Sequence, residues 1–407
     1  MHILLIHQAF TTLDEAGGTR HAELARYLCS FGHQVTVIAS PLSYLTGKTS
    51  PAKESDAFLK EQGITVLRTY TFPGWHRSFF QRVISFITFM FSAVIAGLRV
   101  KNVDVVWGTS PPLFQAASAW LLAKLKRLPL LFEVRDLWPA FAIQVGVLRN
   151  PFLIAPAEWF ERFMYRQADI VLINSPGFMD HVTDRGARQV VVVPNGVDTH
   201  LFTPEADGSQ IRLRYGLEDK LVVLYAGAHG LSNDLGIVLE AAAYLLPHTS
   251  IKIVLVGDGK EKPNLMRQAT ALNLSNVLFL PPFSKQEMPQ VLAAADACLA
   301  ILKPLPLYKT VYPNKVFDYL AAGKPILLAI DGVIRQVVEE AQAGIFVPPG
   351  NPQALAKAVL YLSENPQLCR QMGEKGRIAA VTHFERAQQA AQLNQILEKL
   401  TASSLSS

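Results

Sequence analysis

Two glycines, Gly17 and Gly18, stand where an α/β chain can hold a phosphate group. They follow the short apolar run Ile3–Ile6 and precede a helical pattern at Ala22–Phe31. Backbone N–H groups in such a turn bind phosphate oxygens, and glycine lets the ligand approach closely. Arg20 follows the turn and could reach the same anion. The alternatives are a plain tight turn and a solvated arginine, and the spacing is not the G-x-G-x-x-G of nicotinamide sites.

Arg135 and Asp136 form a second candidate pair, and we expect them to be catalytic. They follow the apolar run Leu130–Val134, and α/β sheets present their site residues at the carboxyl ends of strands. A guanidinium can stabilise a developing oxyanion. The alternative is a buried structural ion pair. Trp138 and Pro139 either shape a neighbouring cleft or pack in the core.

Lys315 and Asp318 lie three positions apart in a helical pattern, so both fall on one helix face near its N-terminus. This is a favourable place for an anionic ligand. The turn Gly257-Asp258-Gly259 follows another apolar run and either contacts the same ligand or serves only as a structural turn.

The elements that must position these residues alternate in type along the chain. Short continuous apolar runs separated by helical patterns predict parallel strands covered on both faces. The pattern restarts after the polar stretch Thr203–Gln210. We expect two doubly wound α/β domains, residues 1–198 and 199–385, whose ligands bind in the cleft between them, and a last helix and frayed tail at 386–407 able to pack across both. The expected strands are Ile3–Ile6, Gln34–Ala39, Thr65–Arg68, Val103–Trp107, Leu130–Val134, Ile170–Asn174, Val190–Val193, Val222–Tyr225, Lys252–Val256, Val277–Leu280, Ala297–Ile301, Pro325–Ala329 and Gly344–Val347.

The composition excludes several classes of protein. Half of the 407 residues are apolar and 17% are charged, so the chain is not a disordered protein. The three cysteines have no paired spacing, which argues against disulfides and zinc and for a reducing compartment. The N-terminus reads as a first strand instead of a signal peptide, so we expect a cytoplasmic protein. No D-x-D or H-E-x-x-H motif is present, so we expect no metal and no cofactor.

A basic and strongly apolar stretch suggests contact with a membrane. The run Val83–Leu98 has 16 residues, fewer than the ~20 of a spanning helix. It is either a buried helix or an element lying on an anionic membrane. Trp75, Phe79 and Phe80 precede it. The segment from Gly63 to Arg127 contains one acidic residue, Asp104, and eight basic residues. The basic residues are Arg68, Arg77, Arg82, Arg99, Lys101, Lys124, Lys126 and Arg127.

Five segments together resemble the retaining GT-B glycosyltransferases of family 4, most closely the branch of WbuB-type L-fucosamine transferases. The resemblance covers nearly the whole chain, and EVRDLWP and PNKVFDYLAAGKPI are fairly specific together. The five segments are Gly17–Leu28, Glu133–Pro139, Val193–Phe202, Val256–Gly259 and Pro313–Ile326. Such enzymes have two facing Rossmann-like domains, and the resemblance implies an acceptor site in the first and a nucleotide-sugar site in the second.

The resemblance also assigns roles to single residues. Many relatives have His-Asp facing the donor sugar where this chain has Arg135 and Asp136. The family's E-x7-E motif becomes Thr310 and Asp318 here. Asp318 can still accept hydrogen bonds from a ribose, whereas Thr310 brings no charge to the donor sugar.

The usual phosphate-binding cations are missing. Relatives carry an Arg and a Lys where this chain has Ala228 and Asn233. A departing pyrophosphate needs a positive partner in a metal-free site. We expect Lys315, and after it Lys309, to supply that charge. Further candidates in the same loop are Gly227, His229 and Gly230.

The sequence and the resemblance thus predict a glycosyltransferase that moves a sugar from a nucleotide-sugar of UDP type to a lipid-linked saccharide in surface polysaccharide synthesis. Closing of the two domains would exclude water. We expect peripheral contact with the inner face of an anionic membrane. The alternatives are a non-catalytic subunit of a polysaccharide assembly complex and a nucleotide-sugar 2-epimerase. Nucleic acid is not an expected partner, because the basic stretch is interleaved with a long apolar run.

Overall fold

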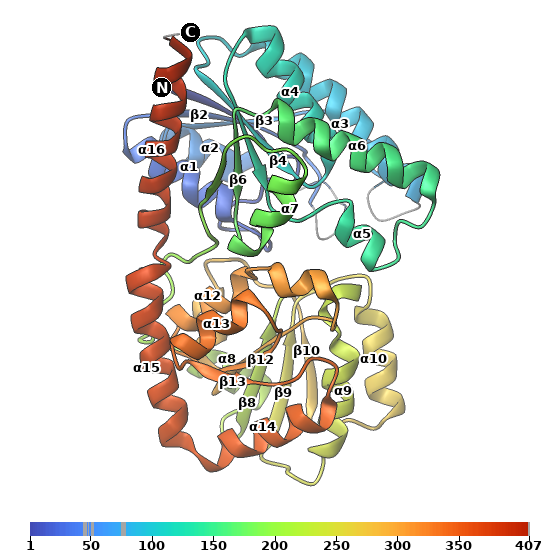
Figure 1. Cartoon of the computed structure of the whole chain (residues 1–407). Coiled ribbons are helices and arrows are strands. Elements are labelled where there is room, and N and C mark those ends of the chain that lie inside the picture. Colours follow the sequence, from blue (N-terminus) through green and yellow to red (C-terminus); the bar gives the residue numbers. More distant parts are fainter. Residues whose placement is uncertain (44–46, 48, 50–52, 75–78, 406–407) are drawn as a thin grey trace. The chain divides into compact units, whose positions relative to one another are not determined.

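A computed structural model describes residues 1–43, 47, 49, 53–74 and 79–405 of the chain (Figure 1). Trp75 and Arg77, two residues of the expected basic and apolar stretch, lie outside the described residues. The chain divides into two compact units. Unit 1 comprises Met1–Pro194 and Ala387–Ser407, and unit 2 comprises Asn195–Arg386. The C-terminal segment therefore belongs to unit 1.

Unit 1 is a doubly wound α/β layer structure. Its described residues form a parallel seven-stranded sheet in the order β3-β2-β1-β4-β5-β6-β7. The strands are β1 (His2–Ile6), β2 (Gln34–Ala39), β3 (Ile64–Arg68), β4 (Val105–Ser110), β5 (Leu130–Val134), β6 (Ile170–Ile173) and β7 (Val190–Val192). The helices are α1 (Arg20–Ser30), α2 (Lys53–Glu61), α3 (Phe79–Arg99), α4 (Leu113–Lys126), α5 (Ala140–Gln144), α6 (Pro151–Gln167), α7 (Met179–Asp184) and α16 (Arg386–Leu405), with a short 3-10 helix η1 (Pro176–Phe178).

The two faces of this sheet are covered by different helices. α1 and α16 pack on one face, where Leu393 and Leu397 of α16 join Leu24 and Leu28 of α1 in the buried core. α3, α4 and α6 cover the other face and lie side by side (Figure 1). Strand order reverses between β1 and β4, so the carboxyl ends of these two strands flank the crevice where such sheets bind ligands.

Unit 2 repeats this plan. Its described residues form a parallel six-stranded sheet in the order β10-β9-β8-β11-β12-β13. The strands are β8 (Leu221–Ala226), β9 (Ile251–Val256), β10 (Val277–Leu280), β11 (Ala297–Ile301), β12 (Ile326–Ala329) and β13 (Gly344–Phe346). The helices are α8 (Ser209–Tyr215), η2 (Leu231–Asn233), α9 (Leu235–Tyr244), α10 (Lys262–Ala271), α11 (Met288–Ala293), η3 (Pro306–Thr310), α12 (Asn314–Ala321), α13 (Val333–Glu340), α14 (Pro352–Glu364) and α15 (Pro366–His383).

The predicted fold class, two doubly wound α/β domains, is confirmed, and each predicted strand has a counterpart in the structure. β4 differs most: it runs Val105–Ser110 instead of the expected Val103–Trp107. Polar Thr109 and Ser110 continue it because they are buried at the strand end. The apolar run Val83–Leu98, expected to be either a buried helix or an element lying on a membrane, belongs to the longer helix α3 (Phe79–Arg99). Only 22% of the window Phe80–Arg99 is buried in the structure.

Candidate functional site

At the carboxyl edge of the unit 2 sheet, the loops that follow β8 and β9 pack with their backbones in contact. The loop after β8 begins at Gly227 and the loop after β9 begins at Gly257. The Gly227 N–H donates to the Val256 carbonyl at 3.0 Å. A Cβ atom on Gly257 would lie only 1.9 Å from the Gly227 carbonyl oxygen, and both glycines have positive φ. These glycines are therefore required by close backbone packing at the carboxyl ends of β8 and β9.

Lys315 lies against this glycine turn. Its Nζ is 3.9 Å from the centre of the Tyr225 ring, and a Cβ on Gly227 would come within 2.6 Å of it. Among the described residues no carboxylate pairs with this ammonium. Burial lowers the pKa of Lys315 to about 7. An ammonium that has no carboxylate partner among the described residues, at the end of the central strand, is a candidate anion-binding group.

The N-terminus of α12 also has polar groups that lack hydrogen-bond partners among the described residues. Lys315 is its second residue, and the first N–H groups of a helix have no partner within the helix. The residue before the helix, Pro313, provides no side-chain cap. The buried Oδ1 of Asn314 has no hydrogen-bond partner within the described residues. The positive end of the helix and the Lys315 ammonium thus favour one ligand class, a phosphate-like anion.

His229 and Gly259 contribute packing to this crevice and no charge. His229 is fully buried, and a Cβ on Gly259 would meet its carbonyl oxygen at 2.5 Å. Burial, followed by the charges of Lys262 and Lys315, lowers the pKa of His229 to about 4. Its imidazole is therefore neutral near pH 7. His229 therefore supplies no cation to this loop.

Lys309 and Thr310, also expected near the donor, are already engaged. The Lys309 Nζ lies 2.9 Å from Asp331 Oδ2, and the Lys309 side chain is 60% exposed. The Thr310 hydroxyl donates to the Leu307 carbonyl at 2.6 Å. Of the two predicted cations, Lys315 is the one that the structure brings to Gly227. Gly230, predicted in the same loop, opens η2 as its N-terminal flanking residue.

Asp318 faces a cation that no sequence pattern indicated. Both of its carboxylate oxygens lie 2.8 Å from the Lys285 Nζ. The same ammonium lies 4.5 Å from the centre of the Phe202 ring. Lys285 stands in the loop after β10, 33 residues before Asp318 in the chain. A ligand that bonds to Asp318 would meet this ammonium as well.

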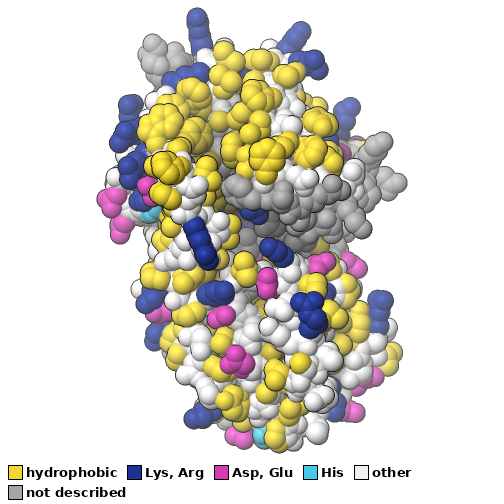
Figure 2. Space-filling model, turned by 90° about the vertical axis from the view of Figure 1, so that its right-hand side faces the viewer, with side chains coloured by type: hydrophobic (Ala, Val, Ile, Leu, Met, Phe, Trp, Pro, Cys, Tyr) yellow, Lys and Arg dark blue, Asp and Glu magenta, His cyan; other side chains and the backbone are white. Residues whose placement is uncertain are grey.

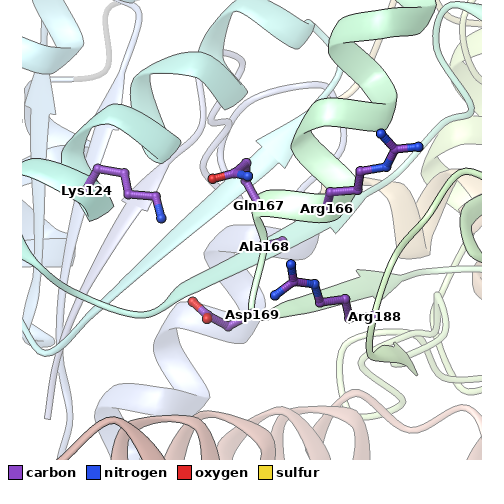
Figure 3. A pocket seen from close by; sticks show the side chains of 6 residues that line it. All are labelled: Lys124, Arg166, Gln167, Ala168, Asp169 and Arg188. Atoms are coloured by element: carbon purple, nitrogen blue, oxygen red, sulfur yellow. The ribbon is translucent and has the colours of Figure 1, made fainter. Parts of the chain in front are cut away.

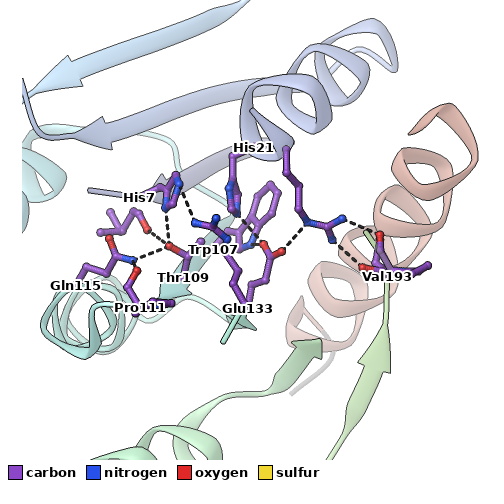
Figure 4. Close-up of polar contacts among 12 residues, drawn as sticks. His7, His21, Trp107, Thr109, Pro111, Gln115, Glu133 and Val193 are labelled. Carbon is purple, nitrogen blue, oxygen red and sulfur yellow. Dashed lines mark hydrogen bonds and ion pairs between the residues drawn. The ribbon is translucent and has the colours of Figure 1, made fainter. Parts of the chain in front are cut away.

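The crevice of unit 1 holds a hydrogen-bond network in which each role is determined (Figure 4). The Gln115 amide is oriented because its Oε1 accepts from the Gln8 N–H at 2.6 Å. Its Nε2 therefore donates to Thr109 Oγ1 at 2.8 Å, and the Thr109 hydroxyl donates to a main-chain carbonyl. The remaining Thr109 lone pair accepts from His7 Nδ1 at 2.9 Å. His7 thus presents its Nε2 lone pair to Arg135, whose NH1 lies at 3.3 Å.

This network fixes His7 as a neutral acceptor. Burial, and then the charges of His21 and Arg135, hold the pKa of His7 well below its usual range. Sequence reasoning did not single out His7. The signal that could have found it is its place, directly after the carboxyl end of β1.

Arg135 and Asp136 do not pair with each other, so the structural ion pair considered from the sequence is absent. Arg135 is half-buried, and its NH2 would lie 3.7 Å from a Cβ on Gly18, so it faces the predicted glycine turn. Gly17 in that turn has a φ of +146°, which favours glycine. Desolvation raises the pKa of the Asp136 carboxyl to about 6, and the charge of Arg135 opposes the rise.

Arg20, predicted to reach the donor, has a structural place instead. Its side chain is buried and its Nε donates to Glu133 at 2.9 Å. Its NH1 and NH2 donate to the carbonyls of Pro194 and Val193, each at 2.7 Å. Glu133 also accepts from His21 Nε2 and Trp107 Nε1 (Figure 4). Arg20 therefore joins α1 to β5 and to the end of β7.

Two family models match the chain in succession. The "Glycosyl transferase 4-like domain" matches residues 16–196, and "Glycosyl transferases group 1" matches residues 209–379. The chain is 26% identical over 376 residues to the protein of Escherichia coli (strain K12) named as the colanic acid biosynthesis glycosyl transferase WcaI, which covers 88% of this chain and 92% of that protein.

Two further similarities support the same classification. A D-inositol 3-phosphate glycosyltransferase of Streptomyces bingchenggensis (strain BCW-1) is 31% identical over 66% of this chain, which spans 60% of that relative's length. The structure of Anabaena HepE in complex with UDP-glucose superposes with a TM-score of 0.74 at 19% identity, over 98% of this chain and 100% of that one. At this identity the second similarity concerns the fold.

Proposed function

We propose, from the fact that this chain belongs to the family 4 glycosyltransferases of GT-B fold, that it transfers a sugar from a UDP-type nucleotide-sugar to a saccharide carried on a lipid. Unit 2 binds the donor and unit 1 binds the acceptor. The reaction retains the configuration at the anomeric carbon and uses no metal. The WbuB-type branch remains a prediction.

One observation supports the donor site: the Lys315 ammonium, which has no carboxylate partner among the described residues, lies at Gly227 and at the start of α12. A nucleoside diphosphate leaving group gains negative charge as the sugar departs. Lys315 and the N–H groups at the N-terminus of α12 would stabilise that charge without reorganising, because they are already in place. They would replace the Arg and Lys that relatives carry at Ala228 and Asn233. Asp318 would accept hydrogen bonds from the ribose, next to Lys285.

In unit 1 the acceptor would meet Arg135 and Asp136. Arg135 is held by His7 and faces Gly18, so its guanidinium can contact an oxygen of the reacting sugar. With a pKa of about 6, Asp136 is ionised at neutral pH and still basic enough to take a proton from an attacking hydroxyl. Since we identify no carboxylate nucleophile among the described residues, we propose attack from the face that the leaving phosphate occupies.

A membrane setting follows from the proposed acceptor. WcaI is named for colanic acid biosynthesis, and a fold neighbour, WaaG, is described as involved in lipopolysaccharide biosynthesis. We propose by analogy a cytoplasmic enzyme at the inner face of the membrane, acting on a polyprenyl-diphosphate-linked saccharide.

The first test is thermal unfolding of the purified chain with UDP, GDP and ADP. A ligand present at a hundred times its Kd adds about 2.7 kcal/mol to the free energy of unfolding. We expect UDP to raise the Tm and Asp318→Ala to reduce that shift. A shift with GDP or ADP alone would change the donor class. If no nucleotide shifts the Tm, the non-catalytic subunit becomes the better interpretation.

The second test is turnover of the UDP-sugar that binds. Transfer to a lipid-linked saccharide, or slow hydrolysis without an acceptor, excludes the non-catalytic subunit. Formation of an epimer without any acceptor would instead identify a 2-epimerase. Transfer should also decline as the pH falls through about 6, because Asp136 becomes protonated there.

A further inference from the structure

Large apolar side chains are exposed on three helices of unit 1. On α6, Phe152 is 84% exposed and Trp159 is 64% exposed. On α3, Phe91 and Ile95 are 60% and 55% exposed. Single exposed apolar residues are common on protein surfaces, but a contiguous group marks a contact surface. The remaining members on these helices are Phe80, Leu98, Leu121, Leu125 and Leu153.

The three helices form one continuous layer. α3 lies so close to α4 that a Cβ on Gly97 would be 2.5 Å from Leu122. α4 and α6 meet through the rings of Trp120 and Phe163, whose centres are 5.0 Å apart. Figure 2 shows hydrophobic side chains gathered over unit 1 in this region, with lysines and arginines around them. We call the exposed apolar residues of α3, α4 and α6 the apolar face.

α3 exposes more apolar surface than core packing requires. Its buried residues recur at every fourth position, Ser85, Phe89, Ala93 and Gly97, a narrow stripe that faces the unit. Phe80–Arg99 has a mean hydropathy of 1.6 and is only 22% buried. By length and composition alone α3 could cross a membrane. The packing of α3 on α4 and on β2 holds this helix against the sheet. The apolar face can therefore lie on the surface of a membrane, but α3 cannot span the membrane.

Cations collect where the three helices end. The Lys124, Arg166 and Arg188 side chains line one pocket together with Asp169 (Figure 3). The exposed cations at this edge are Arg99, Lys101, Lys124, Arg127, Arg166 and Arg188. None of them is in an ion pair within the described part of the chain. The two nearby carboxylates are engaged by backbone N–H groups: Asp104 by His2 at 2.6 Å and Asp169 by Leu130 at 2.7 Å.

We propose that the apolar face docks on a bilayer containing anionic phospholipid, with its apolar side chains among the acyl chains and the cation edge at the phosphate groups. Aromatic residues beside a row of cations match the acyl-chain region and the phosphate region of such a membrane. A second copy of this chain is a poorer fit, because another such face would offer the cation edge no anionic groups. This proposal rests on the proposed lipid-linked acceptor for its purpose, but its test needs no activity.

The experiment is sedimentation of the whole chain with vesicles of phosphatidylcholine, with and without phosphatidylglycerol. We expect binding to anionic vesicles that weakens as salt rises. The double variant Phe91→Ser/Ile95→Ser should bind on the order of a hundredfold more weakly, about tenfold for each side chain. Its control, Ile378→Ser/Val381→Ser, removes exposed apolar residues from α15 of unit 2 and should bind like the wild type. None of the four side chains is buried, so each variant should fold.

The charge test uses Lys124→Gln/Arg166→Gln. Each cation at an anionic surface strengthens binding about fivefold, so this variant should bind about 25-fold more weakly. Lys357→Gln/Arg370→Gln, two exposed cations of unit 2, is the matched control.

Three outcomes would overturn the docking proposal. One is failure of the wild type to bind anionic vesicles although UDP raises its Tm, in which case the donor site stands alone. Another is equal weakening by the face variants and their unit 2 controls. The last is dissociation of a dimer by Phe91→Ser/Ile95→Ser in light scattering without loss of vesicle binding, which would assign the face to a second copy. Vesicle binding without any nucleotide shift supports docking and removes the donor proposal.

Discussion

Replacing Lys315 by Met should stabilise the ligand-free protein while weakening its hold on a nucleotide. The pKa of Lys315 in the folded state, about 7, lies below that of an unfolded lysine. Between these two values the unfolded chain binds more protons, so the contribution of Lys315 to stability rises with pH across that window and is least favourable below pH 7. The carbon chain of Met can occupy the space over the Tyr225 ring without bringing a charge.

The size of the effect follows from the shift. Keeping Lys315 charged in the fold at pH 6 costs roughly 5 kcal/mol as an upper limit. Its contact with the Tyr225 ring at 3.9 Å recovers about 1–2 kcal/mol of that cost. We therefore expect Lys315→Met to raise the free energy of unfolding by about 2 kcal/mol at pH 6, or about 4–8 °C in Tm for a unit of this size. At pH 9 the gain should be half of that or less, because the folded lysine is neutral there.

Lys315→Met should have the opposite effect on nucleotide binding and weaken the affinity for UDP. Losing a charge-assisted bond to the diphosphate costs about 1.5–3 kcal/mol, or roughly 10- to 150-fold in Kd. At a UDP concentration a hundred times the wild-type Kd, the stabilisation should fall from about 2.7 to about 1 kcal/mol. The assay is thermal unfolding at pH 6 and pH 9, with and without UDP.

Lys309→Met is the matched control for this prediction. Lys309 is exposed and paired with Asp331, so its removal should leave both the pH dependence and the UDP shift unchanged. A lower Tm of Lys315→Met at pH 6 would show that the ammonium supports the fold. An unchanged UDP shift in Lys315→Met, together with a lost shift in Lys309→Met, would refute the assignment of the diphosphate to Lys315.

Three further predictions concern the fold and the unit 1 network. Glu133→Gln should destabilise the protein by about 3–5 kcal/mol at pH 7, because it leaves the buried Arg20 guanidinium uncompensated. Urea unfolding measures this change. His7→Phe should lower kcat about tenfold by releasing Arg135, while the UDP shift stays unchanged. Gly257→Ala should cost about 1–3 kcal/mol, because its Cβ would collide with backbone.

Each of these predictions has its own check. Burial alone would raise the pKa of Glu133, but the charges of His21 and Arg20 lower it below its usual range. The stability that ionised Glu133 provides is therefore lost as the pH falls below about 4. Glu133→Gln should lack that loss. His7→Gln retains an acceptor and should recover part of kcat. Gly236→Ala, where a Cβ meets nothing, should stabilise by about 0.5–1 kcal/mol.

The strands were predictable because parallel strands buried on both faces are continuous apolar runs. The one clear displacement, β4, occurs where the strand turns polar. Thr109 looks like a loop residue in the sequence, but it is buried as the acceptor of His7 and Gln115. Its polarity serves the network at the crevice, which periodicity does not report.

The partners of single side chains were not predictable. Arg20 and Glu133 are 113 residues apart, and Lys285 and Asp318 are 33 apart. Nothing in local spacing distinguishes an arginine that meets a ligand from one that meets a buried carboxylate. The position of Lys315 was predictable because helix geometry places the second residue of α12 at the end that favours anions.

The route of the chain between the units has a consequence for its synthesis. The chain leaves unit 1 at Pro194 and returns at Ala387, so unit 2 is an insertion within unit 1. The ends of the insertion are joined, because Arg386 N–H donates to the Val197 carbonyl and Val197 N–H to that of Phe384. Unit 2 is therefore a closed body whose two ends meet.

The core of unit 1 is complete only after α16 has been synthesised. Leu393 and Leu397 of α16 complete the core around α1, and they emerge after the whole insertion. At ~5–20 residues per second, this core stays open for roughly 10–40 s after its strands have been translated. A chain cut short before Ala387 should leave unit 2 intact and unit 1 with an exposed core, a substrate for chaperones and proteases.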